Sequence, residues 1–230
     1  MYADGEYYAT LAEASGAASI IILADNTAEE AVALAGKTTI NVKEGVTFLA
    51  NITVAEGSQV TIEGAGTIRG ADAHTIINNG TLIINGDVVI DNIKHAKAAV
   101  YNASGAKFEM NGGWLMRSAE AGKSPSDNGG NSYYVLENKG IAFISAGTIS
   151  YDRDYSRHNY SSLIENGWAD PAQNISELNA EMTITGGYFN GGLNTVKNDD
   201  YGVMAIEGGV FEGAFNRIVL NWNVLSISGG

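Results

Sequence analysis

One short stretch of the chain brings together residue types that could perform acid–base chemistry. Asp152, Arg153, Asp154 and His158 supply two carboxylates, a guanidinium group and an imidazole within seven positions. Such groups could serve general acid–base catalysis, for example in a polysaccharide lyase. All four are expected on a single loop, however, where mixed charge usually forms solvated surface. We interpret the stretch as surface and leave catalysis open as an alternative.

The other reactive residue types show no spacing that indicates catalysis or metal binding. His74, His95 and His158 are far apart in the sequence and do not match the spacing of metal ligands. The chain has no cysteine, which excludes a disulfide framework and a Cys-based metal site. No serine lies in a Gly-x-Ser-x-Gly motif, and no phosphate-binding glycine loop follows a strand. We expect no catalytic residue, no metal and no cofactor.

Tyrosine, arginine and tryptophan near the same stretch are better suited to binding. Exposed Tyr and Arg are common in binding surfaces, and the same side chains can stack on sugar rings or bond their hydroxyl groups. Trp168, beside Ala169-Asp170-Pro171, is the tryptophan that we most expect to be exposed. The candidate binding residues are Arg117, Tyr133, Asp152, Arg153, Asp154, Tyr155, Arg157, His158, Tyr160 and Trp168.

A repeat should position these residues. The phrases at 182–189, 204–211 and 225–230 each alternate apolar with small or polar residues and then carry Gly-Gly, as half-buried strands entering tight bends do. Similar bends recur along the chain at Gly45, Gly66, Asp87, Gly113, Gly147, Gly187, Gly209 and Gly230. The short intervals between these marks are about 21 to 22 residues long, which suits one turn of a β-helix. The three intervals from Asp87 to Gly187 are longer, so we interpret them as the same turn with loops added.

Two sets of residues are expected inside the solenoid. An Asn follows an apolar residue once per coil, and it can bond the same Asn of the next coil, so we predict an internal asparagine ladder. Its members are Asn78, Asn102, Asn138, Asn166 and Asn198. The residues expected to fill the bore are Ile62, Ile68, Ile84, Val89, Phe108, Met110, Phe143, Ile149, Ile184, Phe189, Ile206 and Phe211.

The long coils carry their additional residues at one point of the repeat. Stacking in register would place the segments 91–98, 117–132 and 152–161 along one edge, whereas the insertion 168–180 lies at a different corner. The three segments hold six of the 13 basic residues and have a formal charge of +1, although the whole chain has a charge of −13. We expect this edge to be the binding surface. The overall negative charge argues against nucleic acid and anionic lipid as partners.

We expect one domain over residues 1–230, with an N-terminal cap and first strand over 1–24 and coils over 25–230. Thr10-Leu11-Ala12-Glu13 is a capping box and predicts a short helix over 11–18. The chain lacks an apolar run of about 18 residues and a signal peptide. Because Leu225-Ser226-Ile227-Ser228-Gly229-Gly230 stops partway through a repeat, we expect a C-terminally truncated fragment of a longer protein.

Several phrases resemble a known group of proteins over nearly the whole chain. They are Tyr8-Ala9-Thr10-Leu11-Ala12-Glu13-Ala14, Ile21-Ile22-Leu23-Ala24-Asp25-Asn26-Thr27 and the repeated Ile184-Thr185-Gly186-Gly187-Tyr188-Phe189. They resemble pectin-lyase-like, right-handed parallel β-helix proteins on the surfaces of Gram-positive gut bacteria. The resemblance implies a single-stranded right-handed parallel β-helix in a secreted, adhesin-like protein. It implies no catalytic residue, because this group shares no active-site motif.

Asn198-Asp199-Asp200 resembles part of the acidic set of β-helical pectin hydrolases. The accompanying Gly-His-Gly and Arg-x-Lys signatures are missing, and Arg217-Ile218-Val219 is their nearest remnant. This departure puts the hydrolase activity in doubt.

We therefore predict a non-catalytic, extracellular, cell-surface β-solenoid segment of a larger bacterial protein. It would act in adhesion, by binding a glycan or a host or cell-surface protein through the loops stacked on one edge. Two alternatives stay open, a phage virion fibre or tailspike-like receptor-binding protein and a polysaccharide lyase or hydrolase. We expect no nucleic-acid partner and no membrane insertion, and the sequence leaves the oligomeric state open.

Overall fold

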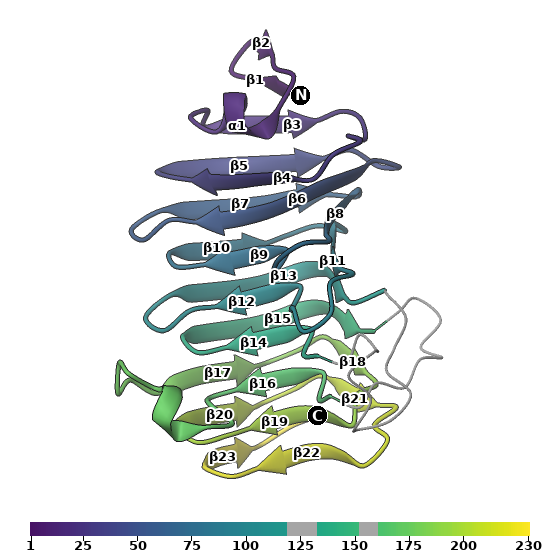
Figure 1. Cartoon of the computed structure of the whole chain (residues 1–230). Coiled ribbons are helices and arrows are strands. Elements are labelled where there is room, and N and C mark those ends of the chain that lie inside the picture. The colour runs from purple at the N-terminus through teal and green to yellow at the C-terminus, as the bar shows by residue number, and fades with distance from the viewer. Residues whose placement is uncertain (119–132, 152–160) are drawn as a thin grey trace.

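Strands that stack parallel on the equivalent strands of the next coil account for most of the chain. The structure is a computed structural model, and it describes residues 1–118, 133–151 and 161–230. Its parallel pairings form three stacked arrays, which we call the first, second and third ladders after their order within a coil (Figure 1). The described strands make about eight turns. The chain is thus a parallel β-solenoid, as the repeated alternation and Gly-Gly bends predict.

The bounds of the strands follow the order of the ladders. The first ladder stacks β3 (Ser19–Ile22), β5 (Lys37–Val42), β7 (Gln59–Gly64), β10 (Thr81–Ile84), the first halves of β13 (Lys107–Met116) and β15 (Ile141–Ser150), β17 (Ala180–Ile184), β20 (Gly202–Ile206) and β23 (Val224–Ile227). The second stacks the first half of β6 (Thr47–Val54), β8 (Thr67–Gly70), β11 (Val89–Asn92), the second halves of β13 and β15, β18 (Tyr188–Asn190) and β21 (Val210–Glu212). The third stacks β4 (Glu30–Leu34), the second half of β6, β9 (Ile76–Asn78), β12 (Val100–Asn102), β14 (Leu136–Asn138), β16 (Ile164–Asn166), β19 (Asn194–Asn198) and β22 (Arg217–Asn221).

The coil lengths agree with the spacing of the sequence marks. Residues that pair in register along the second ladder are Thr47, Thr67, Val89, Trp114, Thr148, Tyr188 and Val210. Their intervals are short at both ends of the series and longer between Val89 and Tyr188, as the marks predict. The Gly-Gly bends also behave as expected, since Gly187 and Gly209 both adopt a φ of 105°, a region that residues with a side chain rarely occupy.

Apolar side chains fill the bore of the solenoid, and two of the twelve predicted positions are wrong. Phe143 is 39% exposed, because it pairs with the outward-facing Glu109 and Thr183, and its neighbour Ile144 is buried in its place. Val89 is buried but is not part of the central apolar cluster, which contains Ile90 instead. Both errors shift the strict alternation by one residue, which moves a side chain to the opposite face of the strand.

The predicted asparagine ladder is present. Each Asn side chain is fully buried and donates from its Nδ2 to the Oδ1 of the Asn in the next coil, at 2.7 Å in every step. The rungs are Asn78, Asn102, Asn138, Asn166 and Asn198. Asn198 donates in the same way to Asn221, also at 2.7 Å. This last rung was missed, although an Asn after Val219-Leu220 repeats the signal.

The N-terminal segment differs in length from its prediction. The helix α1 spans Leu11–Ala14 instead of 11–18. The capping box is confirmed, since Thr10 and Glu13 bond each other's backbone N–H groups reciprocally. The short strands β1 (Tyr2–Ala3) and β2 (Glu6–Tyr7) pair antiparallel with each other, and β1 pairs antiparallel with β3. The role of α1 as a cap stays a prediction.

Candidate functional site: the loop edge

The corner between the second and third ladders is where the added segments were expected to form the binding surface, and we call it the loop edge. Its described parts are 71–75, 93–99, 117–118, 133–135, 161–163 and 191–193. The strands on both sides of the predicted segments 91–98, 117–132 and 152–161 are in register. The described ends of all three segments therefore lie at this corner. Insertion 168–180, with the short helix η1 (Pro171–Gln173), joins the third ladder to the first.

Most of the ten candidate binding residues cannot be placed at this edge. Asp152, Arg153, Asp154, Tyr155, Arg157, His158 and Tyr160 lie outside the described residues. Of the candidates, Arg117, Tyr133 and Trp168 are described. Their surroundings decide what the loop edge can do.

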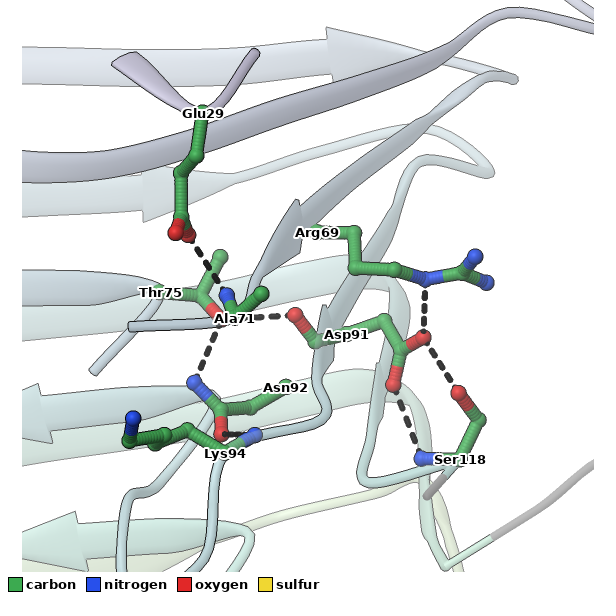
Figure 2. A network of polar contacts seen from close by, with 8 residues as sticks. All are labelled: Glu29, Arg69, Ala71, Thr75, Asp91, Asn92, Lys94 and Ser118. Carbon is green, nitrogen blue, oxygen red and sulfur yellow. Dashed lines mark hydrogen bonds and ion pairs between the residues drawn. The ribbon is translucent and has the colours of Figure 1, made fainter. Parts of the chain in front are cut away.

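Asp91 is the centre of a polar network that holds the loop edge together (Figure 2). Its fully buried carboxylate accepts a hydrogen bond from Nε of Arg69 at 2.8 Å. It also accepts from the backbone N–H and the hydroxyl of Ser118, at 2.9 and 2.5 Å. Such charge-assisted bonds offset the desolvation of a buried carboxylate. Asp91 therefore links three coils and is not one of the surface charges that we expected at this edge.

The next residue, Asn92, fixes two neighbouring loops. Its Nδ2 donates to the carbonyl of Ala73 at 2.7 Å and to Oγ1 of Thr75 at 3.0 Å, while its Oδ1 accepts from the N–H of Lys94 at 2.9 Å. Figure 2 shows the bonds of Asn92 to Thr75 and Lys94, together with the one that Glu29 accepts from the N–H of Ala71, at 2.5 Å. Segment 71–75 and the start of segment 93–99 are thus preorganised.

Aromatic rings from successive coils meet beside this network, and we call them with Arg117 the aromatic cluster (His74, Tyr101, Arg117 and Tyr133). The ring centroid of His74 is 5.2 Å from that of Tyr101 and 6.3 Å from that of Tyr133. The guanidinium carbon of Arg117 lies 5.8 Å from the centre of the Tyr133 ring. All three rings are half-buried. They form a wall that runs along the solenoid axis.

The electrostatics of this cluster keep its histidine neutral. Burial, and then the positive charges of Lys97 and Arg117, lower the pKa of His74 to about 4. Its Nδ1 accepts a hydrogen bond from the N–H of Ala98 at 2.9 Å, which requires an unprotonated Nδ1. At neutral pH His74 is therefore an uncharged ring with a fixed orientation, suited to contact and not to proton transfer.

Arg117 is not the exposed cation that the sequence suggested. It is 1% exposed, and one of its NH2 groups donates to the carbonyl of Lys94 at 2.7 Å. Burial lowers its pKa to about 10, so it stays protonated at neutral pH. Its contacts fix segment 93–99 and the Tyr133 ring. Arg117 therefore holds the residues of the loop edge in place from a buried position.

A second cluster, which sequence reasoning missed, lies on the outward face of the third ladder. We call it the carboxylate–lysine cluster (Glu137, Lys139 and Glu165). Lys139 Nζ lies 2.5 Å from Glu165 Oε2 and 3.3 Å from Glu137 Oε1, and it donates to the carbonyl of Gly167 at 2.6 Å. All three side chains are buried. The signal in the sequence was a Glu directly before two successive ladder asparagines.

The carboxylate–lysine cluster has the residue types of an acid–base site. Burial raises the pKa of Glu165 to about 7, with a further contribution from the charge of Glu137, while Lys139 opposes the shift. The OH of Tyr133 donates to Glu137 Oε2 at 2.9 Å. A raised carboxyl pKa is typical of general acids, but structural ion pairs perturb pKa values as well. Since both carboxylates are buried and bonded, the geometry fits an ion-pair network that stabilises the fold, and we call this network the internal brace.

Trp168 is part of this brace, which corrects the expectation that it is exposed. It is 6% exposed, its backbone N–H donates to the carbonyl of Asp200 at 3.0 Å, and Lys139 Nζ lies 5.6 Å from its ring centre. Its ring also meets Tyr201 edge-on at 6.1 Å. The exposed tryptophan is Trp222, at 68%. The Ala-Asp-Pro sequence after Trp168 indicated a loop correctly, but this loop folds back onto the third ladder.

The remaining acidic candidates do not form a catalytic group with each other. Asp199 is buried and paired with Lys197 at 2.7 Å, whereas Asp200 is exposed. Arg217 pairs with Asn194 at the other end of β19. Among the described residues there is no group of three or more acidic or histidine side chains that could hold a metal ion. Neither helical segment of the described chain has the length and apolar character needed to cross a bilayer.

Comparison with protein-family models, with curated protein sequences and with solved structures finds no match for this chain.

Proposed function

We propose that this protein is a non-catalytic binding solenoid whose loop edge contacts a glycan or a protein. The observation that carries the proposal is the aromatic cluster, in which half-buried rings from successive coils form a fixed wall. Aromatic rings supply contact area with little loss of conformational entropy, and they can stack on sugars. The network around Asp91 and Asn92 keeps this wall in place before a ligand binds, which lowers the entropy lost on binding.

The biological setting is part of the same proposal. The resemblance of the sequence to pectin-lyase-like surface proteins of Gram-positive gut bacteria supports an extracellular, adhesin-like role within a larger protein. The solenoid would then act as a rigid stalk, because each coil is bonded to the next along three ladders. The loop edge would supply the contacts with the partner.

A polysaccharide lyase or hydrolase is the second candidate function, and one observation favours it. The pKa of Glu165 is raised to about 7, and Glu137 lies on the neighbouring strand. A neutral acid beside a carboxylate is the arrangement that glycoside hydrolysis uses. Burial of both groups in contact with Lys139 argues against it, since a sugar would have to displace this contact.

The proposal is tested by binding to immobilised glycans and extracellular proteins. The first variant is Tyr101→Ala, which removes a ring of the wall. The second combines Arg153→Ala, Tyr155→Ala and Tyr160→Ala. Tyr7→Ala is the control, because Tyr7 is 80% exposed on β2, far from the loop edge. We expect both variants, but not the control, to bind a ligand of the wild-type protein with an affinity at least tenfold lower. Unchanged binding by both variants would refute the assignment.

A further inference from the structure

The corner between the first and second ladders carries a hollow that the loop edge does not use, and we call it the glycine groove. Its volume is about 530 Å³. Its lining comes from successive coils and includes Glu44, Ala65, Asp87, Gly113, Trp114 and Thr148. A second hollow of about 390 Å³ shares Glu44, Ala65 and Asp87 with it and widens it toward the ends of the first-ladder strands. The groove therefore runs with the solenoid axis, across the coils.

The length of the groove fits an extended polymer. Glu44 and Thr148 belong to the first and last of five successive coils. With a strand spacing of about 4.8 Å, these coils span roughly 20 Å. Sugar units of an extended, unbranched glycan repeat at a similar spacing, so that each coil can offer its groove residues to one unit.

Beside the groove, on its first-ladder side, a row of polar side chains that we call the rim runs from coil to coil. Asn41 and Glu63 of this row line the second hollow, and the other members directly precede or lie close to the lining glycines in the chain. Asn111 Nδ2 donates to Asn85 Oδ1 at 3.3 Å, and the Ser145 hydroxyl donates to Asn111 Oδ1 at 2.9 Å. In the coils before them, Asn41 Nδ2 donates to Glu63 Oε1 at 3.2 Å. Amide, hydroxyl and carboxylate groups in this row match the hydroxyl groups of sugars as hydrogen-bond partners.

Trp114 supplies a flat apolar surface within this polar hollow. It lies on the outward face of the second ladder, in register with Val89 and Thr148. Its Nε1 donates to the hydroxyl of Ser150 at 2.8 Å, which fixes the plane of the ring. The tight bends account for the glycines at this corner, but the fold gives no structural reason for a tryptophan at position 114. Sugar-binding sites commonly combine an aromatic ring with groups that form hydrogen bonds to the sugar hydroxyl groups.

The negative charge of the groove argues against an anionic glycan as its ligand. Glu44, Asp87 and the adjoining Glu63 contribute three carboxylates, while Lys43 is the basic residue of its described lining. The whole chain is also acidic, with a formal charge of −13. A polymer of uronic acids or a sulfated glycan would be repelled.

We propose that the glycine groove binds an unbranched, uncharged glycan lengthwise along the solenoid axis, at a site separate from the loop edge. The Trp114 ring stacks on one sugar, and the side chains of the rim and the acidic residues bond the hydroxyl groups of the others. The site holds the polymer without cleaving it.

The experiment measures binding of the whole chain to neutral unbranched glucan, mannan, galactan and xylan oligosaccharides of two to eight units by calorimetry. Polygalacturonate is the anionic probe. We expect at least one neutral series to bind, with an affinity that rises up to four or five units and then stays level. The proposal is overturned if no neutral series binds, if affinity does not depend on length, or if polygalacturonate binds at least as well.

Variants then locate the site. Trp114→Ala should lower the affinity at least tenfold, and Ala65→Leu should do the same by filling the hollow at an exposed position. Trp222→Ala is the matched control, since Trp222 is exposed at the C-terminal end of the structure. Tyr101→Ala should leave this binding unchanged, which separates it from the function proposed for the loop edge. Full affinity in Ala65→Leu would place the glycan elsewhere and refute the assignment.

Discussion

Removing one central rung of the asparagine ladder should destabilise the whole solenoid. Asn138 is fully buried and its Nδ2 donates to Asn166 Oδ1 at 2.7 Å. Its Oδ1 accepts from Asn102 Nδ2 at 2.7 Å and from the N–H of Gly140 at 3.2 Å. The change Asn138→Ala deletes these bonds together with those to the carbonyls of Gly140 and Glu181.

The magnitude follows from the groups that lose their partner. Asn102 Nδ2 keeps a bond to the carbonyl of Ile141 at 3.3 Å, but Asn166 Oδ1 and the Gly140 N–H lose the partner described here. Each buried polar group left unpaired costs about 1–3 kcal/mol. We therefore expect Asn138→Ala to lower the free energy of unfolding by about 4 kcal/mol, a large share of the roughly 5–15 kcal/mol typical of folded proteins.

The matched control is the terminal rung. Asn221 is exposed, and Asn198 Nδ2 would keep its bonds to the carbonyls of Gly202 and Val224, at 3.1 and 2.9 Å. Asn221→Ala should cost less than about 1 kcal/mol. Urea unfolding, followed by circular dichroism and by tryptophan fluorescence, measures both variants. Equal and small losses for the two variants would refute the idea that the buried ladder stabilises the coils.

Three further changes probe other parts of the structure. The pKa of His74 falls from 6.5 to about 4 on folding, so the neutral ring stabilises the folded state above pH 6.5, and this stability is lost as the pH falls toward 4. His74→Asn should reduce the acid-induced loss of stability by on the order of 2 kcal/mol, a value discounted for the partial exposure of the ring. Urea unfolding at several pH values measures this difference. Lys139→Met leaves the buried Glu137 and Glu165 without their cation and should cost about 3–5 kcal/mol at pH 8. The loss should be smaller at pH 5, where Glu165, with its pKa of about 7, is protonated. Equal losses at the two pH values in urea unfolding would contradict the ion-pair account. Gly187→Ala, at a φ of 105° with the added Cβ 3.2 Å from the carbonyl of Gly147, should lower stability by about 1–3 kcal/mol in thermal unfolding, whereas Gly16→Ala, where nothing lies within 4 Å, should be near neutral.

The repeat itself was readable from the sequence because its causes are local. A Gly-Gly bend, an alternating strand and an Asn after an apolar residue each impose a backbone geometry, and their recurrence fixes the register of the coils. Asn78 to Asn198 were found for this reason. Phe143 and Val89 were misplaced because a shift of one residue reverses the face of a strand, and only the pairing with Glu109 or Thr67 decides that face.

The candidate site was less predictable because contacts between coils decide its chemistry. Arg117 and Asp91 were read as surface charges, but their partners, the Lys94 carbonyl and Arg69, belong to other coils. Trp168 has the sequence surroundings of an exposed loop residue, yet it is buried by Lys139 from the coil before it and Tyr201 from the coil after it. Sequence reasoning located the loop edge without showing which of its side chains face a ligand.

Binding without turnover is the central claim of the account for the loop edge. The most direct measurement incubates the whole chain with each glycan or protein that it retains, and records bound protein and released reducing or unsaturated sugar ends in the same samples. For a ligand that binds the loop edge, the account predicts retention that is lost in Tyr101→Ala, with no release of sugar ends. Release of sugar ends by the wild-type protein that disappears in Glu165→Gln would contradict it and establish the carboxylate–lysine cluster as catalytic.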